Sequence, residues 1–345
     1  MQGVRLSSPS VNVLRSNINN KDPRPSAGGF VQIRAFSKIN LILEVLRKRP
    51  DGYHEIRSVM QSLALHDMVA ITIHDSGVTL PLLTKVSKPD LGAGDDCKLR
   101  VTCSNPRIPT DDRNLVTRAA KHMMREYGIM QPVSIHLEKR IPEAAGLAGG
   151  SSDCAAALLG LNRLFNLNIT QAGLMKIGRS LGADVPFCIM ACANQSDTND
   201  YFGATALAEG VGEKLIPFPP HPHVWVVLAC PDIQVSTGSI FGQYKTHGRT
   251  ARRDDSKYNA MLQALIHGDL DKIAANFKND LAQVTIKLYP EIQDIINEMA
   301  SQGALGTAMS GSGPTVFGYF GNKEQAEKAQ AVLQYMTGRA FLTHT

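Results

Sequence analysis

The chain has 345 residues, of which 43% are hydrophobic and 19% charged, and its formal net charge is +5. This length suffices for one large domain or two closely joined domains, and the composition is typical of a soluble globular protein. No run approaches the roughly 18 uninterrupted apolar residues of a membrane-spanning helix, so we expect no membrane association. The small, scattered positive charge disfavours nucleic-acid binding and suits a phosphorylated small substrate.

The six cysteines form no C-x-x-C pair and no histidine spacing of a zinc site. We interpret them as small buried hydrophobic residues in a reducing compartment. Residues 1–30 are rich in Ser, Asn, Pro and Arg and lack the apolar core of a secretory signal. We expect a disordered N-terminal extension and a cytoplasmic protein. A plastid transit segment, which has a similar composition, is the alternative.

The first half of the chain mixes strand and helix patterns. Apolar and polar residues alternate on both sides of the turn sequence RPDGYH, which is typical of a strand pair. In chain order we expect strands over 31–48 and 55–74, a surface insertion around one or two strands over 79–110, a helix between Asn114 and Gly128, and a strand from Val133. A Gly-rich loop, an alanine-rich helix and a second helix capped by Thr170 follow.

The second half continues in the same mixed order. We expect strands over 206–218 and 223–235, helices around 259–267, 269–276 and 279–303, a turn and strand over 307–320, and a last helix over 324–336. This order predicts an α+β fold, because a regularly alternating βαβ chain would place a helix between successive strands.

The stretch PEAAGLAGGSS, residues 142–152, places three glycines and two serines directly before a helix. A helix start has unpaired N–H groups and a partial positive charge, and glycines let its backbone approach a phosphate. Neither the Walker loop nor the dinucleotide-binding loop matches, so this phosphate loop is of another kind. The serine hydroxyls can donate or reach a metal. The alternative is a turn capped by Ser151 or Ser152 with no ligand.

Two further features support a site. Lys38 and Asn40 lie two residues apart on the first strand and therefore project from the same face. A second Gly/Ser loop over residues 310–313 precedes a strand. Each has an ordinary structural explanation when taken alone, an exposed strand residue and a hairpin turn, but together they favour a phosphate-binding enzyme.

The segments SKINLILEVLRKRPDGYHEI, IPEAAGLAGGSSDCAAAL, GADVPF and MSGSGPTVF occur in the same order in the GHMP kinases, which this chain resembles from about Val31 onward. The first segment resembles most closely the members that phosphorylate a cytidyl-diphosphate-linked methylerythritol in the non-mevalonate isoprenoid pathway. The resemblance implies a two-lobed fold, with an N-terminal domain over 31–190 carrying the ATP loop and a C-terminal domain over 191–345. It also implies that nucleotide and substrate bind in the cleft between the lobes.

The resemblance assigns roles by position. Lys38 and Asp184 match the catalytic pair, with Asp184 as the general base and Lys38 as the cation that keeps it ionised and stabilises the hydroxyl. Pro186 is expected to hold Val185 extended and to leave Asp184 exposed at a turn. The ATP contacts are Asn114 together with Pro142, Glu143, Ala144, Ala145, Gly146, Leu147, Ala148, Gly149, Gly150, Ser151 and Ser152.

By the same resemblance, the substrate contacts are Asn40, Tyr53 and His54, together with Thr237 and Phe241, which match a hydroxyl and an aromatic ring beside the cytosine. Tyr53 and Phe241 would stack on the two faces of the pyrimidine, and His54 would read its edge. We expect ATP and Mg²⁺ as cofactors, metal ligands that the sequence does not identify, and a monomer or weak homodimer.

Two alternatives remain at this point. One is another GHMP kinase acting on mevalonate, homoserine or a sugar, which the aromatic and histidine residues of Asp51–His54 disfavour. The other is a nucleotide-binding protein without catalysis, which the presence of both Lys38 and Asp184 disfavours. The loop also has Ala144, Ala145 and Ala148 where relatives often carry glycine, so we expect a stiffer backbone there.

Overall fold

The structure is a computed structural model of the chain, and it describes residues 29–74, 98–193, 203–244 and 254–345. The expected N-terminal extension and most of the expected 79–110 insertion lie outside the described residues. No helix in the described part of the chain is long and apolar enough to cross a membrane.

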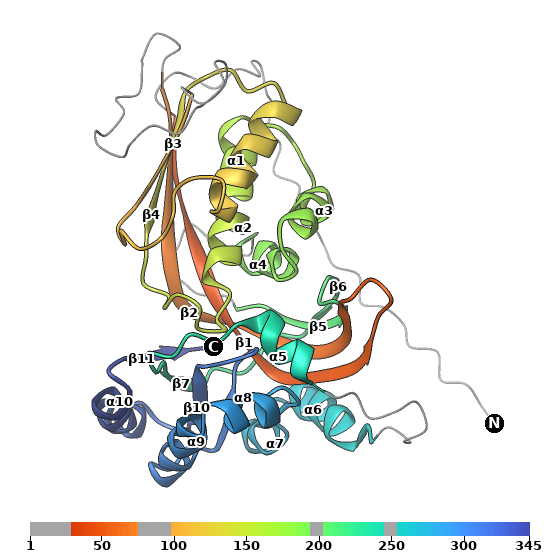
Figure 1. Cartoon of the computed structure of the whole chain (residues 1–345), viewed down its shortest axis with the longest axis vertical. Coiled ribbons are helices and arrows are strands. Elements are labelled where there is room, and N and C mark those ends of the chain that lie inside the picture. Colours follow the sequence, from red (N-terminus) through yellow and green to blue (C-terminus); the bar gives the residue numbers. More distant parts are fainter. Residues whose placement is uncertain (1–28, 75–97, 194–202, 245–253) are drawn as a thin grey trace, which may run out of the picture.

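Two long antiparallel strands, β1 (Phe30–Lys48) and β2 (His54–Ile73), run from one half of the molecule into the other (Figure 1). They form the centre of a sheet with the order β3-β4-β2-β1-β8. Strand β5 pairs with the N-terminal part of β2, and β6 pairs with β5. The added strands are β3 (Leu99–Cys103), β4 (Val133–Glu138), β5 (Thr205–Gly210), β6 (Lys214–Phe218) and β8 (Lys278–Asn279).

Four helices cover one face of the upper part of this sheet (Figure 1). They are α1 (Leu115–Glu126), α2 (Gly149–Leu164), α3 (Gln171–Leu181) and α4 (Val185–Ala193). The small residues of α2 allow close packing on the strands: a Cβ at Gly160 would lie only 2.5 Å from Cδ1 of Ile71. This packing places the start of α2 at the lower edge of the helical layer.

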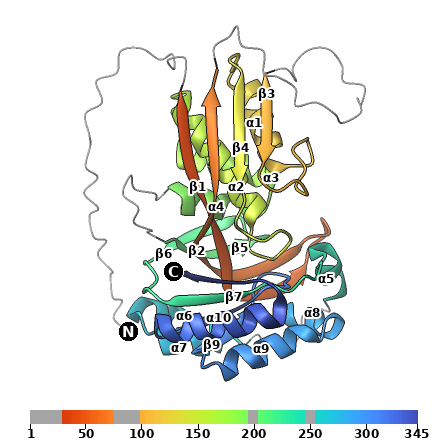
Figure 2. The same cartoon turned by 90° about the vertical axis from the view of Figure 1, so that its left-hand side faces the viewer.

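A second sheet has the strand order β11-β7-β10-β9. Helices α6 to α10 lie on the side of it that faces away from the first helical layer (Figures 1 and 2). The strands are β7 (Trp225–Ala229), β9 (Gly306–Met309), β10 (Val316–Phe320) and β11 (Ala340–His344). The helices of this half are α5 (Thr237–Gln243), α6 (Ser256–His267), α7 (Leu270–Ala275), α8 (Ala282–Leu288), α9 (Glu291–Ser301) and α10 (Lys323–Thr337).

The predicted α+β class is confirmed, and several elements differ from expectation. The prediction that Pro186 holds Val185 extended is wrong: α4 begins at Val185, and its first turn accommodates the proline because a helix start needs no N–H there. The strand expected over 223–235 ends at Ala229 and leads into α5. Elements β8, α4, α5 and β11 had no distinct sequence signal.

The domain division at residue 190 remains a prediction. Strands β5 and β6 lie beyond that residue in the sequence, yet they pair with β2 of the first sheet. The two halves therefore share one continuous sheet through β1 and β2.

Candidate active site

A cavity of about 660 Å³ lies where the two halves meet. Its walls come from β1, from the segment that leads into α1, from the Gly-rich loop, from the start of α4, from α5 and from the second Gly/Ser loop. These segments are far apart in the sequence. The fold thus brings the three sequence features that predicted a site to a single cavity.

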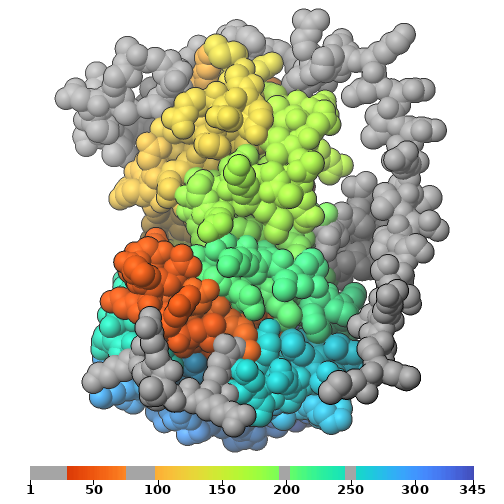
Figure 3. Space-filling view, turned by 90° about the vertical axis from the view of Figure 1, so that its right-hand side faces the viewer, coloured from red at the N-terminus to blue at the C-terminus, as the bar shows by residue number. Residues whose placement is uncertain are grey.

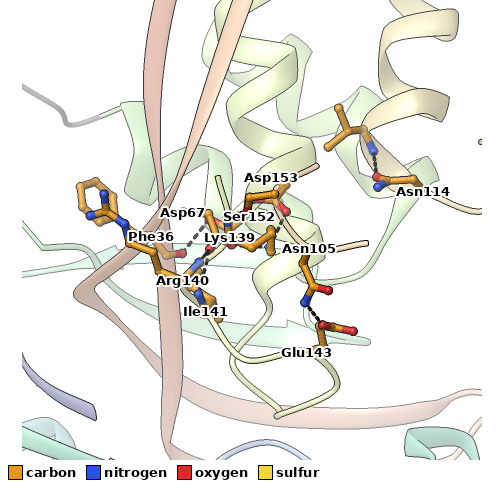
Figure 4. Close-up of polar contacts among 12 residues, drawn as sticks. Phe36, Asp67, Asn105, Asn114, Lys139, Arg140, Ile141, Glu143, Ser152 and Asp153 are labelled. Carbon is orange, nitrogen blue, oxygen red and sulfur yellow. Dashed lines mark hydrogen bonds and ion pairs between the residues drawn. The ribbon is translucent and has the colours of Figure 1, made fainter. Parts of the chain in front are cut away.

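Helix α2 begins at Gly149, directly after Ala148, and no side chain caps it. The first N–H groups of a helix have no partner inside the helix, so an uncapped start is suited to an anion. The expectation that Ser151 or Ser152 caps this turn is therefore wrong. Ser152 is buried and donates its hydroxyl to the carbonyl of Phe36 at 2.7 Å, so it cannot reach a phosphate or a metal (Figure 4). Ser151 lines the cavity.

The Gly-rich loop has an unusual backbone. Ala144 and Ala148 have φ values of 50° and 59°, in the left-handed region that costs a residue with a Cβ about 1–2 kcal/mol. Gly146 has φ 75°, and a Cβ there would lie 2.4 Å from the backbone oxygen of Ser310. Ser310 also donates its hydroxyl to the carbonyl of Gly146 at 2.9 Å. The two glycine-containing loops are thus held in direct contact.

The second loop is held from the other side by Asn279. Its amide donates to the carbonyls of Met309 at 2.7 Å and Gly311 at 2.8 Å. Ser312 exchanges a hydroxyl hydrogen bond with Thr237 at the start of α5, at 2.8 Å. Asn279 therefore positions one wall of the cavity. The sequence analysis included Ser312 in the second Gly/Ser loop but assigned neither Asn279 nor Ser312 a role of its own.

Lys38 and Asn40 point to the same side of β1, as predicted. The ammonium of Lys38 donates to Oδ1 of Asn40 at 2.8 Å and lies 3.5 Å from Oδ2 of Asp184. The Lys38 side chain is only 5% exposed, whereas Asp184 is 32% exposed at the cavity. Asn40 in turn donates to the hydroxyl of Ser58 at 2.8 Å. A carboxylate that can accept a proton is thus held beside a buried cation.

The residues assigned to the substrate are only partly assembled around the cavity. Asn40, Thr237 and Phe241 line it, whereas Tyr53 and His54 do not. The His54 ring packs against Phe241 with centroids 5.2 Å apart, and burial lowers the pKa of His54 below its ordinary value. Tyr53 is 65% exposed at the hairpin tip, which Figure 3 shows on the surface in orange-red beside the green β5 and β6 region.

Asn114 has a structural role as the cap of α1 (Figure 4). Its Oδ1 accepts from the backbone N–H of Val116, and its amide donates to the carbonyl of Pro109 at 2.7 Å. The residue still lines the cavity. The amide oxygen and the amide nitrogen of Asn114, which was expected to contact ATP, therefore both have backbone partners.

Several cavity residues were missed by the sequence analysis. Arg107 and Lys139 line the cavity, and Arg107 lies 3.6 Å from the carboxylate of Glu143. Glu143 also accepts a hydrogen bond from Asn105 (Figure 4). The spacing of Arg107 and Lys139 in the sequence follows no motif. The only sequence signal was the position of Lys139 just before the Gly-rich loop.

Among the residues that the structure describes, no group of three or more His, Cys, Asp or Glu side chains is placed to hold a metal ion. The expectation that cysteines are buried is confirmed for Cys154, Cys188, Cys192 and Cys230, while Cys103 is half-buried. Burial raises the pKa of Cys154 to about 12 and that of Cys192 to about 11, so both thiols are unreactive.

Comparison with known families gives two matches. The family described as "GHMP kinases N terminal domain" matches residues 114–192, and the family described as "GHMP kinases C terminal" matches residues 261–336. The first match contains the Gly-rich loop and Asp184. The second contains Asn279 and the second Gly/Ser loop.

The similarity to individual proteins extends over most of the chain. A 4-diphosphocytidyl-2-C-methyl-D-erythritol kinase of Acetivibrio thermocellus is 41% identical over 91% of this chain and 99% of its own length. The corresponding enzyme of Caldicellulosiruptor bescii is 40% identical over 91% of this chain and 98% of its own. A crystal structure of 4-(cytidine 5'-diphospho)-2C-methyl-D-erythritol kinase superposes with a TM-score of 0.71 at 30% identity, covering 91% of this chain and 98% of that one. A mevalonate kinase from L. major, at 15% identity over 93% of this chain and 98% of its own, shares the fold with a TM-score of 0.66.

Proposed function

Because this chain belongs to the 4-diphosphocytidyl-2-C-methyl-D-erythritol kinases of the GHMP kinase superfamily, we propose that it transfers the γ-phosphoryl group of ATP to the 2-hydroxyl of 4-diphosphocytidyl-2-C-methyl-D-erythritol. It is an ATP-dependent kinase of isoprenoid precursor synthesis with an alcohol group as acceptor. The observation that carries the proposed transfer to a hydroxyl group is the 3.5 Å distance between Lys38 and Asp184 at the cavity wall. The same cavity contains the uncapped start of α2.

In the proposed reaction, Asp184 accepts the proton of the attacking hydroxyl while the ammonium of Lys38 stabilises the negative charge on the oxygen. Phosphoryl transfer requires mainly positioning and neutralisation of charge. One carboxylate to take the proton and one cation to stabilise the oxygen therefore suffice at the acceptor hydroxyl. The hydrogen bond from Lys38 to Asn40 supports this role, because it fixes the ammonium in place before substrate binds.

The ATP phosphates are proposed to lie against residues 142–152, on the N–H groups of Gly149, Gly150 and Ser151. Mg²⁺ bound with ATP usually keeps water and phosphate oxygens as ligands and takes only one or two protein groups, which fits a cavity without a carboxylate cluster in the described residues. The Ser151 hydroxyl at the cavity wall is the protein group that would hold it. The ion would neutralise charge on the transferred phosphoryl group.

The cytosine is proposed to lie against Phe241, near the hydroxyl of Thr237. Its edge would be read by His54, and the lowered pKa supports this role because the neutral ring offers one donor and one acceptor at neutral pH. Tyr53 would close over the other face of the base from the hairpin tip. The backbone N–H of Tyr53 donates to Asp51, which Arg49 pairs with in turn, so the tip is held in shape.

The proposal is tested by measuring ADP release from ATP with the cytidyl diphosphate of methylerythritol, beside mevalonate, homoserine and galactose. We expect turnover with the cytidyl substrate alone. Turnover with one of the other three would instead place the chain among GHMP kinases of a different specificity. ATP binding without turnover of any substrate would favour a nucleotide-binding protein.

We further propose that the enzyme acts in the cytoplasm as a monomer or weak homodimer, with its ATP loop in the domain formed by residues 31–190. Sedimentation at several protein concentrations tests the assembly state. A tight dimer at the lowest concentration would contradict it.

A further inference from the structure

An apolar wall of the cavity has no role in the proposed transfer of the phosphoryl group. It is formed by Ile56 and Met60 of β2 and by Val211 in the turn between β5 and β6, and all three residues line the cavity. Ile56 is 7% exposed and Met60 is 2% exposed. The wall is therefore a packed apolar surface inside a site whose other known groups are charged or polar.

Met60 places the apolar wall at the acceptor end of the cavity. It pairs directly with Asn40 across β1 and β2, so both side chains project from the same face of the sheet. Asn40 accepts a hydrogen bond from the ammonium of Lys38. Met60 also belongs to one apolar cluster with Phe187 of α4, the helix that begins directly after Asp184. The wall is thus adjacent to the strand that carries the cation and to the helix that follows the carboxylate.

The turn between β5 and β6 closes on these side chains. Gly212 has a φ of 111°, and a Cβ there would lie 3.7 Å from both Cδ1 of Ile56 and Cε of Met60. The backbone of the turn therefore rests on the two β2 residues, and Val211 directly precedes this glycine. Figure 1 shows β5 and β6 below α4, beside the hairpin that joins β1 and β2.

The turn is held in place by Glu213, whose side chain is 4% exposed. Its Oε2 accepts from the backbone N–H of Val211 at 2.7 Å, and its Oε1 accepts from Arg179 of α3 at 2.9 Å. Gly210 has a φ of 77°, and a Cβ there would lie 2.4 Å from Oε2 of Glu213, so a side chain would displace the carboxylate. Glu213 therefore ties the wall to the helix that precedes Asp184.

The chemistry of the proposed acceptor accounts for an apolar surface at this place. The carbon that carries the reacting 2-hydroxyl also carries a methyl group, which lies two bonds from the hydroxyl oxygen. A substrate whose hydroxyl reaches Asp184 must therefore place this methyl group close to the catalytic pair. An apolar wall removes the methyl group from water, whereas a hydroxyl at the same place would lose its hydrogen bonds.

We propose that the apolar wall is a subsite for the methyl group on the carbon that bears the acceptor hydroxyl, and that Glu213 is a positioning residue that keeps this subsite closed. Contact with the methyl group fixes the rotation of that carbon and directs its hydroxyl toward Asp184. The subsite therefore selects a tertiary alcohol over a secondary one. This inference rests on the proposed function, because it concerns the acceptor of the same reaction.

The test compares kcat/KM for the cytidyl diphosphate of methylerythritol with kcat/KM for the corresponding erythritol compound, which lacks the methyl group. One carbon in an apolar pocket discriminates by about 10–200-fold, so the wild type should prefer the methylated substrate at least about tenfold. Val211→Ala removes part of the wall without changing a member of the apolar core clusters, and it should lower this preference at least about threefold. Comparing the same two substrates in each variant cancels the intrinsic difference in reactivity between the two alcohols.

A pair of variants tests the role of Glu213. Glu213→Ala leaves the N–H of Val211 without its acceptor and should lower the preference by a similar factor. Glu213→Gln retains an amide oxygen that can accept from this N–H, so it should keep most of the preference. A merely structural role would lower kcat/KM for both substrates equally and leave their ratio unchanged. Val332→Ala, which shortens a 39% exposed side chain of α10, is the matched control and should keep the wild-type ratio.

The outcomes separate this inference from the proposed function. The same substrate ratio in wild type, Val211→Ala and Glu213→Ala, with turnover of the methylated compound intact, would overturn the subsite alone. Turnover of neither cytidyl compound by the wild type would contradict the proposed function and, with it, the subsite.

Discussion

At the scale of single residues, Asp184 combines a partly exposed carboxylate with a cation held 3.5 Å away by the buried β1 strand. We predict that Asp184→Asn lowers kcat by about 10²–10⁴-fold, the usual contribution of a general base. The KM values for both substrates should stay nearly unchanged, because the amide has almost the same shape but cannot take the proton. Steady-state kinetics and nucleotide binding measure the two effects separately.

The matched control is Asp232→Asn, which removes an exposed carboxylate outside the cavity lining and should leave kcat unchanged. A loss of binding equal to the loss of turnover in Asp184→Asn would mean that Asp184 is structural.

His54 carries a pH-dependent prediction. Burial lowers the pKa of His54 from 6.5, so the ring is neutral at pH 7 and gains a proton only at lower pH. Protonation removes the acceptor nitrogen of the ring. The kcat/KM for the cytidyl substrate should therefore decrease at pH values below the ordinary pKa of histidine, while the KM for ATP stays constant. The pH profile of kcat/KM in wild type and His54→Ala checks this.

The same His54→Ala variant should lose discrimination between cytidyl and uridyl substrates, because a site that hydrogen-bonds a base rejects one with mismatched groups. A wild type that accepts both bases equally, or a variant that discriminates as well as wild type, would remove the base-reading role.

At the scale of elements, Gly146 in the Gly-rich loop and Gly150 at the start of α2 should respond differently to substitution by alanine. Gly146→Ala places a Cβ against the backbone oxygen of Ser310 at positive φ, so we predict a loss of about 1–3 kcal/mol in the free energy of unfolding and weaker nucleotide binding. Gly150→Ala is the contrasting variant: its Cβ meets nothing within 4 Å, and it lies inside a helix that begins at Gly149. We expect it to stabilise the fold by up to about 1 kcal/mol and still to weaken nucleotide binding, because the methyl group enters the cavity.

Urea denaturation and nucleotide calorimetry on both variants separate stability from binding. If Gly150→Ala bound nucleotide as well as wild type, the start of α2 would not be the phosphate site.

At the scale of the whole molecule, an ion network connects the first sheet with the helices under the second, and only its Arg57–Glu44 pair is buried. Arg57 of β2 donates to Glu44 of β1 at 2.7 Å and to Asp255, next to α6, at 2.8 Å. Its guanidinium also lies 3.5 Å from the ring centroid of Tyr258 in α6. Lys278 remains 2.8 Å from Oε1 of Glu44, but Arg57→Met removes both hydrogen bonds that the buried Oε2 accepts, so it should lower the free energy of unfolding by about 1–3 kcal/mol.

Chemical denaturation of Arg57→Met tests this, with Lys328→Met as the control. Lys328 forms an exposed pair with Glu324 within α10, and its removal should produce no measurable change. Equal stability of the two variants would show that the network does not hold the halves together.

What the sequence alone determined were properties set by local periodicity and backbone chemistry. The period of two placed Lys38 and Asn40 on one face of β1, and the glycines of residues 142–152 predicted a loop directly before a helix. The resemblance to GHMP kinases, carried by short segments in a fixed order, identified the family before any contact was known. These conclusions needed no knowledge of which distant segments meet.

Only the tertiary structure decided how those parts work together. It brings Asp184 to Lys38, commits the hydroxyl of Ser152 to Phe36, and leaves α2 uncapped. It also places the buried ammonium of Lys139 against the carboxylates of Asp67 and Asp153, an arrangement that no spacing along the chain indicates. Hydrogen-bond partners, burial and the charge balance of a buried cluster depend on residues that are distant in sequence and adjacent in space, so no local pattern encodes them.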